Sequence, residues 1–129
     1  MERKVDEHYP LRGTRILIAE DEILIALDLE AAFCDAGAEI IGPFMTLPEA
    51  LDAAQSELFS IAILDISLGT ATTEAVSDLL TDRGIPFLFY SGQRLTPEMQ
   101  RKWGDAVLID KPAAQDDIVS AAIKILAAA

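Results

Sequence analysis

Short runs of apolar residues recur along the chain, and each is followed by a longer segment that mixes polar and apolar positions. Four of the five runs are continuously apolar, which is typical of strands buried on both faces of a parallel sheet. The predicted strands cover residues 15–19, 39–42, 61–65, 86–90 and 106–109. Pro43 directly follows the second of these, and we expect it to end that strand.

The segments between the runs carry helical signals. Residues 23–36 place apolar side chains at helical spacing, at Ile23, Leu24, Leu27, Ala31 and Cys34. We therefore expect Cys34 to lie in the core. Gly37 and Gly84 are plausible helix stops, and Pro48 suits a first helical turn. The other predicted helices cover residues 47–56, 73–82, 97–103 and 113–128, of which 97–103 is short and poorly patterned.

Strands that alternate with helices predict βαβ units. The sequence therefore predicts an α/β fold, a doubly wound five-stranded parallel sheet with helices on both faces. One domain over residues 15–129 accounts for all of these elements, and residues 1–14 form an N-terminal arm without periodicity. The chain shows no internal repeat and no low-complexity linker.

Composition narrows the class of protein further. The 129 residues are 51% hydrophobic with a mean hydropathy of +0.28, which excludes a disordered chain. The net charge of -12 argues against binding to nucleic acid or to anionic membranes. The single cysteine excludes a disulfide framework and a cysteine-rich zinc site. No apolar run approaches a membrane span and no signal peptide is apparent, so we expect a cytoplasmic protein.

Polar residues stand at the carboxyl ends of four predicted strands, where sites form in doubly wound sheets. Glu20 and Asp21 follow the first strand, Asp65 ends the third, and Ser91 and Lys111 follow the fourth and fifth. Carboxylates that converge repel one another unless they take up protons or bind a cation. Oxygen ligands alone favour Mg²⁺, while an amine and a hydroxyl suit a phosphoryl group.

Each of these residues also has an ordinary structural explanation. The acidic run from Glu20 to Glu22 could favour the next helix through its dipole, and Asp65 could start a turn. Ser91 and Lys111 are weak signals alone. The hypothesis of a site depends on all of them standing at the right strand ends in the right order.

With these motifs, the chain from Arg15 to Ala127 resembles the receiver domain of bacterial response regulators. The resemblance depends on four motifs: the acid pair after Ile-Leu-Ile-Ala, the Ile63-Leu64-Asp65 strand, Ser91-Gly92 and Lys111-Pro112. It implies a flavodoxin-like sheet with strand order 2-1-3-4-5. It also implies a stand-alone phospho-acceptor of a two-component system or phosphorelay, rather than an enzyme with a separate substrate.

The resemblance also implies a role for each site residue. Asp65 would accept the phosphoryl group, with Lys111 and Ser91 contacting it. Mg²⁺ would be held by Glu20, Asp21, Asp65 and the carbonyl of Ser67. The implied partners are a sensor histidine kinase or a histidine phosphotransfer protein, and a downstream protein that the sequence does not identify. The implied oligomeric state is a monomer or a weak homodimer.

One departure from the family pattern, one variant loop and two alternatives accompany this hypothesis. Receivers usually carry an aromatic residue three positions before the lysine, where this chain has Leu108. The segment 89–92 is similar to a Phe-Ala-Thr-Gly loop in a subgroup of receivers, many of which stand alone. A phosphorylation-independent adaptor of the same fold is the main alternative. A flavodoxin-like enzyme or nucleotide binder is disfavoured, because no glycine-rich loop follows the first strand.

Overall fold

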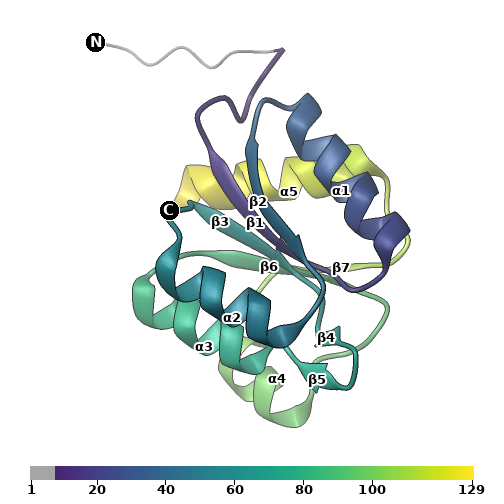
Figure 1. The fold of residues 1–129 in the computed structure, drawn as a ribbon, viewed down its shortest axis with the longest axis vertical. Helices are drawn as coiled ribbons and strands as arrows, with labels where there is room; N and C mark the ends of the chain where they lie inside the picture. The colour runs from purple at the N-terminus through teal and green to yellow at the C-terminus, as the bar shows by residue number, and fades with distance from the viewer. Residues whose placement is uncertain (1–7) are drawn as a thin grey trace.

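The computed structural model describes residues 8–129. Twelve elements are assigned in this range, with five parallel strands forming a central sheet of order β2-β1-β3-β6-β7 (Figure 1). Counted among the sheet strands alone, this is the order 2-1-3-4-5, so the predicted fold class is confirmed. The elements are β1 Arg15–Ala19, α1 Ile23–Asp35, β2 Glu39–Phe44, α2 Leu47–Ser56, β3 Ile61–Leu64, β4 Ser67–Leu68, β5 Ala71–Thr72, α3 Glu74–Arg83, β6 Phe87–Ser91, α4 Pro97–Trp103, β7 Leu108–Asp110 and α5 Gln115–Ala128.

Helices cover both faces of the sheet, with α1 and α5 on one face and α2, α3 and α4 on the other (Figure 1). Successive side chains of a strand point to opposite faces. Leu17 and Leu64 accordingly join the apolar cluster under α2 and α3, whereas Ile16 and Ile63 join the cluster under α1 and α5. This two-sided burial explains why most of the strands are continuous apolar runs.

The strand β2 is longer than predicted, because Pro43 does not end it. The strand runs through Pro43 to Phe44. It lies at the edge of the sheet and pairs only with β1, so the missing N–H of proline leaves no gap in the sheet. The register shifts between Leu17 and Ala19, and the backbone N–H of Glu20 then donates to the carbonyl of Phe44 at 2.9 Å. The extension of β2 therefore fixes the backbone of the first predicted site residue.

The helix α1 has two apolar stripes. The stripe from which the helix was predicted is the exposed one. Ile23, Leu24 and Leu27 are exposed, as are Ala31 and Cys34. The residues that pack on the sheet are Ala26, Leu29, Ala32 and Phe33. The prediction that Cys34 lies in the core is therefore wrong. Small alanines let the helix approach the sheet closely while Phe33 fills the space, so the second stripe is the one that is buried.

A two-stranded hairpin between β3 and α3 is absent from the predicted elements. Strands β4 and β5 pair in antiparallel register, Ser67 with Thr72 and Leu68 with Ala71. Gly69 begins the two-residue loop with a φ of +63°, a conformation that favours glycine. The hairpin lies beside the carboxyl ends of the sheet strands, where it contributes to the candidate site.

The predicted N-terminal arm falls partly outside the described residues. Of its described part, Leu11 is buried in the cluster under α1 and α5, and its backbone N–H donates to the carbonyl of Ala36 at 2.8 Å. In residues 8–129, no helix combines the length and the apolar character that crossing a membrane requires.

Candidate functional site

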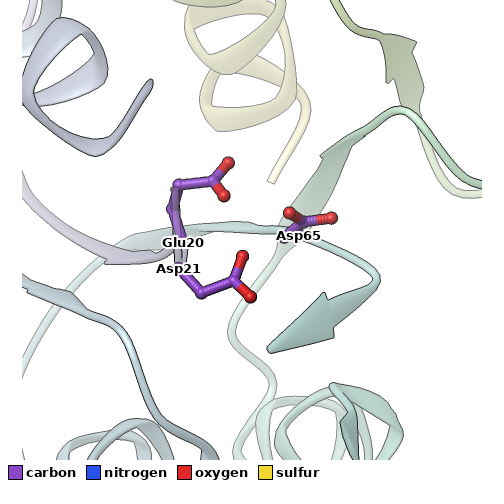
Figure 2. Close-up of side chains that lie close together, drawn as sticks. All are labelled: Glu20, Asp21 and Asp65. Carbon is purple, nitrogen blue, oxygen red and sulfur yellow. The ribbon is translucent and has the colours of Figure 1, made fainter. Parts of the chain in front are cut away.

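All of the sequence-predicted site residues lie at the carboxyl edge of the sheet, and all except the buried Glu20 line one open cavity. Glu20 and Asp21 follow β1, Asp65 follows β3, Ser91 ends β6, and Lys111 follows β7. Ser67, in the hairpin, also lines this cavity. Figure 2 shows the carboxylates of Glu20 and Asp21 projecting from the end of β1 toward Asp65.

Asp65 is held by donors on both of its carboxylate oxygens. Oδ1 accepts hydrogen bonds from Ser91 Oγ at 2.6 Å and from the backbone N–H of Ile66 at 2.7 Å. Oδ2 lies 2.9 Å from the ammonium of Lys111. Burial of Asp65, which is 8% exposed, would raise its pKa, but its interactions with Ser91, Lys111 and Glu20 outweigh burial and lower it. Asp65 is therefore an ionised carboxylate at neutral pH.

The backbone of Asp65 is fixed as firmly as its side chain. Its N–H donates to the carbonyl of Ala19 at 3.0 Å, and its carbonyl accepts from Thr73 Oγ1 at 2.6 Å. Thr73 is fully buried at the start of α3. Sequence reasoning did not identify Thr73 as part of the site, because a threonine before a helix is an ordinary capping residue.

Lys111 is surrounded by three carboxylates. Its Nζ lies 2.7 Å from Glu20 Oε1, 2.8 Å from Glu22 Oε2 and 2.9 Å from Asp65 Oδ2. Burial would lower the pKa of Lys111, but the bonds to these carboxylates outweigh burial and raise it. The third carboxylate, Glu22, was not among the predicted site residues, although it belongs to the same acidic run.

Glu20 is the most buried acid of the site, at 1% exposed. Its Oε2 accepts from the backbone N–H of Glu22 at 3.1 Å. Its Oε1 is buried without a well-aligned hydrogen bond, although the Lys111 ammonium lies beside it. Burial raises the pKa of Glu20 to about 7, more than the bond to Lys111 lowers it.

Carboxylate oxygens of Glu20, Asp21 and Asp65 all lie within 4.8 Å of one another. These are hard oxygen donors and no histidine or cysteine stands among them, which fits Mg²⁺ better than Zn²⁺. The incompletely bonded Oε1 of Glu20 also fits a cation, because it retains lone pairs. Asp21 Oδ2 accepts from the backbone N–H of Gly69 at 2.7 Å, so the hairpin holds this carboxylate in place.

The Ser67 side chain contacts a residue that follows Ser91. Ser67 Oγ donates to Gln93 Oε1 at 2.7 Å, and the backbone N–H of Gln93 donates to Ser91 Oγ at 3.2 Å. These contacts link the hairpin to the end of β6. The assignment of the Ser67 carbonyl as a metal ligand stays a prediction.

An α/β sheet of this order with an acidic cluster and a lysine at its carboxyl edge defines a receiver-like fold, and comparisons agree. No family model matches the chain. The chain is 40% identical to the Phyllosphere-induced regulator PhyR of Methylorubrum extorquens over 106 residues, which is 78% of this chain and 39% of PhyR. It is 31% identical to SdrG from Sphingomonas melonis Fr1, whose solution structure matches with a TM-score of 0.73 over 85% of this chain and 95% of SdrG.

A response regulator receiver protein from Sinorhizobium medicae matches with a TM-score of 0.77 at 22% identity, over 92% of this chain and 98% of that protein, and shows the fold alone. The chain belongs to the response regulator receiver family. It spans between 39% and 54% of the length of the curated relatives that it matches. The curated relatives are named as regulators: PhyR as a Phyllosphere-induced regulator and PdtaR of Mycobacterium tuberculosis as a transcriptional regulatory protein.

Proposed function

We propose that the chain is a phospho-acceptor in which Asp65 takes a phosphoryl group from a phosphohistidine protein or a small phosphodonor. The observation that supports this most is the setting of Asp65: an ionised carboxylate at the rim of an open cavity, with an ammonium and a hydroxyl on its two oxygens. A carboxylate is a weak nucleophile, so its reaction depends on positioning and on charge neutralisation.

The transfer is a displacement at phosphorus. An oxygen of Asp65 forms the new P–O bond, and the bond from phosphorus to the donor's nitrogen or oxygen breaks, with the electron pair leaving on the donor. Lys111 already donates to Asp65 Oδ2 and can donate to a phosphoryl oxygen in the same place. Ser91 can turn its O–H from Asp65 Oδ1 to another phosphoryl oxygen.

Receiver domains bind Mg²⁺ in general, and the acidic cluster of this chain could hold one. Glu20, Asp21 and Asp65 would supply carboxylate oxygens, together with the carbonyl of Ser67. Bound Mg²⁺ supplies positive charge that offsets the charge of the phosphoryl oxygens. Without a cation, the ammonium of Lys111 is shared by Glu20, Glu22 and Asp65, and Asp21 adds a further carboxylate to the cluster. An incoming phosphoryl group then meets net negative charge.

The exposed apolar stripe of α1 supports a protein donor. The stripe consists of Ile23, Leu24 and Leu27 and begins directly after Glu22. Ile25 of the same helix lines the cavity in front of Asp65. A protein that brings a phosphohistidine to Asp65 must cover the surface beside this cavity. We therefore infer that a sensor histidine kinase or a histidine phosphotransfer protein docks on this stripe.

Incubation with acetyl phosphate tests the acceptor role. With Mg²⁺, intact mass spectrometry should detect one added phosphoryl group, and chelation of the metal should abolish it. Asp65→Asn should remain unlabelled while keeping the fold. Absence of labelling in the wild-type chain would favour the phosphorylation-independent adaptor instead.

A further inference from the structure

Tyr90, the residue before Ser91, makes two contacts with the segment that carries Lys111. Its side chain is 6% exposed and lies in the cluster under α1 and α5, on the opposite sheet face from Phe89. The Lys111 ammonium lies 5.7 Å from the centre of the Tyr90 ring. The Tyr90 hydroxyl accepts a hydrogen bond from the backbone N–H of Ala113 at 3.2 Å.

Backbone hydrogen bonding joins the same two segments a third time. The N–H of Lys111 donates to the carbonyl of Ser91 at 3.1 Å. Ser91 thus restrains the backbone of Lys111, and the Tyr90 ring restrains its ammonium. The Tyr90 hydroxyl restrains Ala113, two residues further along the chain. All three restraints come from two adjacent residues of β6.

The geometry points to Tyr90 as a positioning residue that holds Lys111 against Asp65 for phosphoryl transfer. A lysine side chain has four rotatable carbons and a compact charge, so its place depends on what surrounds it. Three carboxylates attract the ammonium of Lys111, and only one of them is the acceptor. The negative face of the aromatic ring attracts the ammonium from another side and limits its excursion toward exposed Glu22.

This role matters in this chain because Leu108 occupies the position that usually carries an aromatic residue. Strand β7 contains Leu108, Ile109 and Asp110, so it offers no ring near the site. Tyr90 supplies a ring from the neighbouring strand instead, and its hydroxyl ties that ring to the loop that enters α5. A displacement of Ser91 would therefore reach Ala113 through Tyr90.

Three variants separate the ring, the hydroxyl and general packing. Tyr90→Phe keeps the ring and removes the hydroxyl, whereas Tyr90→Leu removes both. Phe89→Leu is the matched control, because Phe89 is also a buried aromatic residue of the same strand, on the other sheet face. The proposal rests on the proposed phospho-acceptor function, so each variant is examined by labelling and by a spectroscopic readout that needs no phosphorylation.

Tyr90→Leu should slow labelling by acetyl phosphate and Mg²⁺ about 3- to 30-fold, the range expected for loss of a cation–π contact. Tyr90→Phe should stay within about twofold of the wild type, while its Ala113 amide exchanges about fivefold faster. Phe89→Leu should change neither. In nitrogen-detected NMR, the signal of the Lys111 ammonium should be observable in the wild type, Tyr90→Phe and Phe89→Leu. In Tyr90→Leu, exchange of the ammonium protons with water should broaden this signal.

Wild-type labelling rates in folded Tyr90→Leu, or equal slowing in Phe89→Leu, would overturn the positioning role. If the wild-type chain takes no label, the proposed function fails, and the ammonium signal alone decides the role of Tyr90. In that case an unchanged Lys111 signal in Tyr90→Leu contradicts the proposal, and its selective loss supports it.

Discussion

Ser91 Oγ donates to Asp65 Oδ1 at 2.6 Å, so the hydroxyl at the end of β6 is already bonded to the candidate acceptor before any phosphoryl group is present. The same hydroxyl accepts from the backbone N–H of Gln93 at 3.2 Å. A phosphoryl group on Asp65 would therefore offer Ser91 a new acceptor and change its bonding. The effect would pass to Gln93, and through Gln93 to Ser67 of the hairpin.

Ser91→Ala should leave Asp65 able to accept a phosphoryl group, slowing labelling by less than about tenfold, because one hydrogen bond is lost. Loss of that bond should also raise the pKa of Asp65. Amide exchange with and without beryllofluoride, a phosphoryl mimic, measures the structural response. We expect the changes over residues 91–103 to be largely lost in Ser91→Ala. They should be retained in Ser77→Ala, because Ser77 is a buried serine of α3 whose Oγ donates to the carbonyl of Thr73. An undiminished response in Ser91→Ala would contradict this role.

Mg²⁺ should raise the melting temperature of the chain, because it relieves repulsion among Glu20, Asp21 and Asp65. Asp21→Asn removes one of these charges while keeping an oxygen that accepts from Gly69. We expect the metal-free variant to melt about 2–5 °C higher than the wild type and to lose most of the shift with Mg²⁺. Differential scanning calorimetry measures both. A wild-type melting temperature that millimolar Mg²⁺ leaves unchanged would count against the metal site.

The raised pKa of Glu20 predicts a pH dependence of stability in the absence of Mg²⁺. The folded chain keeps the Glu20 proton up to a pKa of about 7, whereas the ordinary pKa of a glutamate, as in the unfolded chain, is 4.5. Between these values the folded state binds more protons than the unfolded state, so stability falls as pH rises. The shifts of Asp65 and Lys111 act outside this window, because the pKa of Asp65 is lowered from 3.8 and that of Lys111 is raised from 10.5.

Thermal melts from about pH 5 to about pH 8 should therefore show a falling melting temperature, by several degrees, in the metal-free wild type. Glu20→Gln should flatten this slope. A slope that persists in Glu20→Gln would assign it to another group.

The exposed stripe of α1 predicts that a protein donor and a small donor respond differently to one substitution. Leu24→Asp should slow phosphotransfer from the histidine kinase that labels the wild type fastest by about tenfold or more, because an apolar anchor becomes charged. Labelling by acetyl phosphate should not change. Leu58→Asp is the matched control, because Leu58, which lies after α2, is 72% exposed and Leu24 is 74% exposed. Equal rates of transfer from the kinase to Leu24→Asp and to Leu58→Asp would exclude α1 as the docking surface.

The sheet could be predicted because its central strands are buried on both faces and are therefore nearly continuous apolar runs. The convergence of Asp65, Ser91 and Lys111 follows from that topology, since parallel strands end at one edge. The buried side of α1 could not be predicted, because two stripes of α1 both have helical spacing. The choice depends on how closely Ala26 and Ala32 let the helix approach the sheet.

The hairpin and the hydrogen bonds to the site were not predictable for a different reason. Two-residue strands carry no periodicity, and Gly69-Thr70 is a weak turn signal alone. The hydrogen bond from Gly69 to Asp21 is donated by a backbone N–H, and the residue type does not predict where a backbone N–H points. The contact between Tyr90 and Ala113 likewise depends on the packing of β6 against the start of α5.

Localisation of the phosphoryl group tests the central claim most directly. The chain is labelled with acetyl phosphate and Mg²⁺, the acyl phosphate is reduced with borohydride, and the modified residue is mapped by peptide mass spectrometry. We predict that the modification maps to Asp65 alone and is absent from Asp65→Asn. Modification of Glu20, Asp21 or any other carboxylate in the wild type, or unchanged labelling of Asp65→Asn, would contradict Asp65 as the phospho-acceptor.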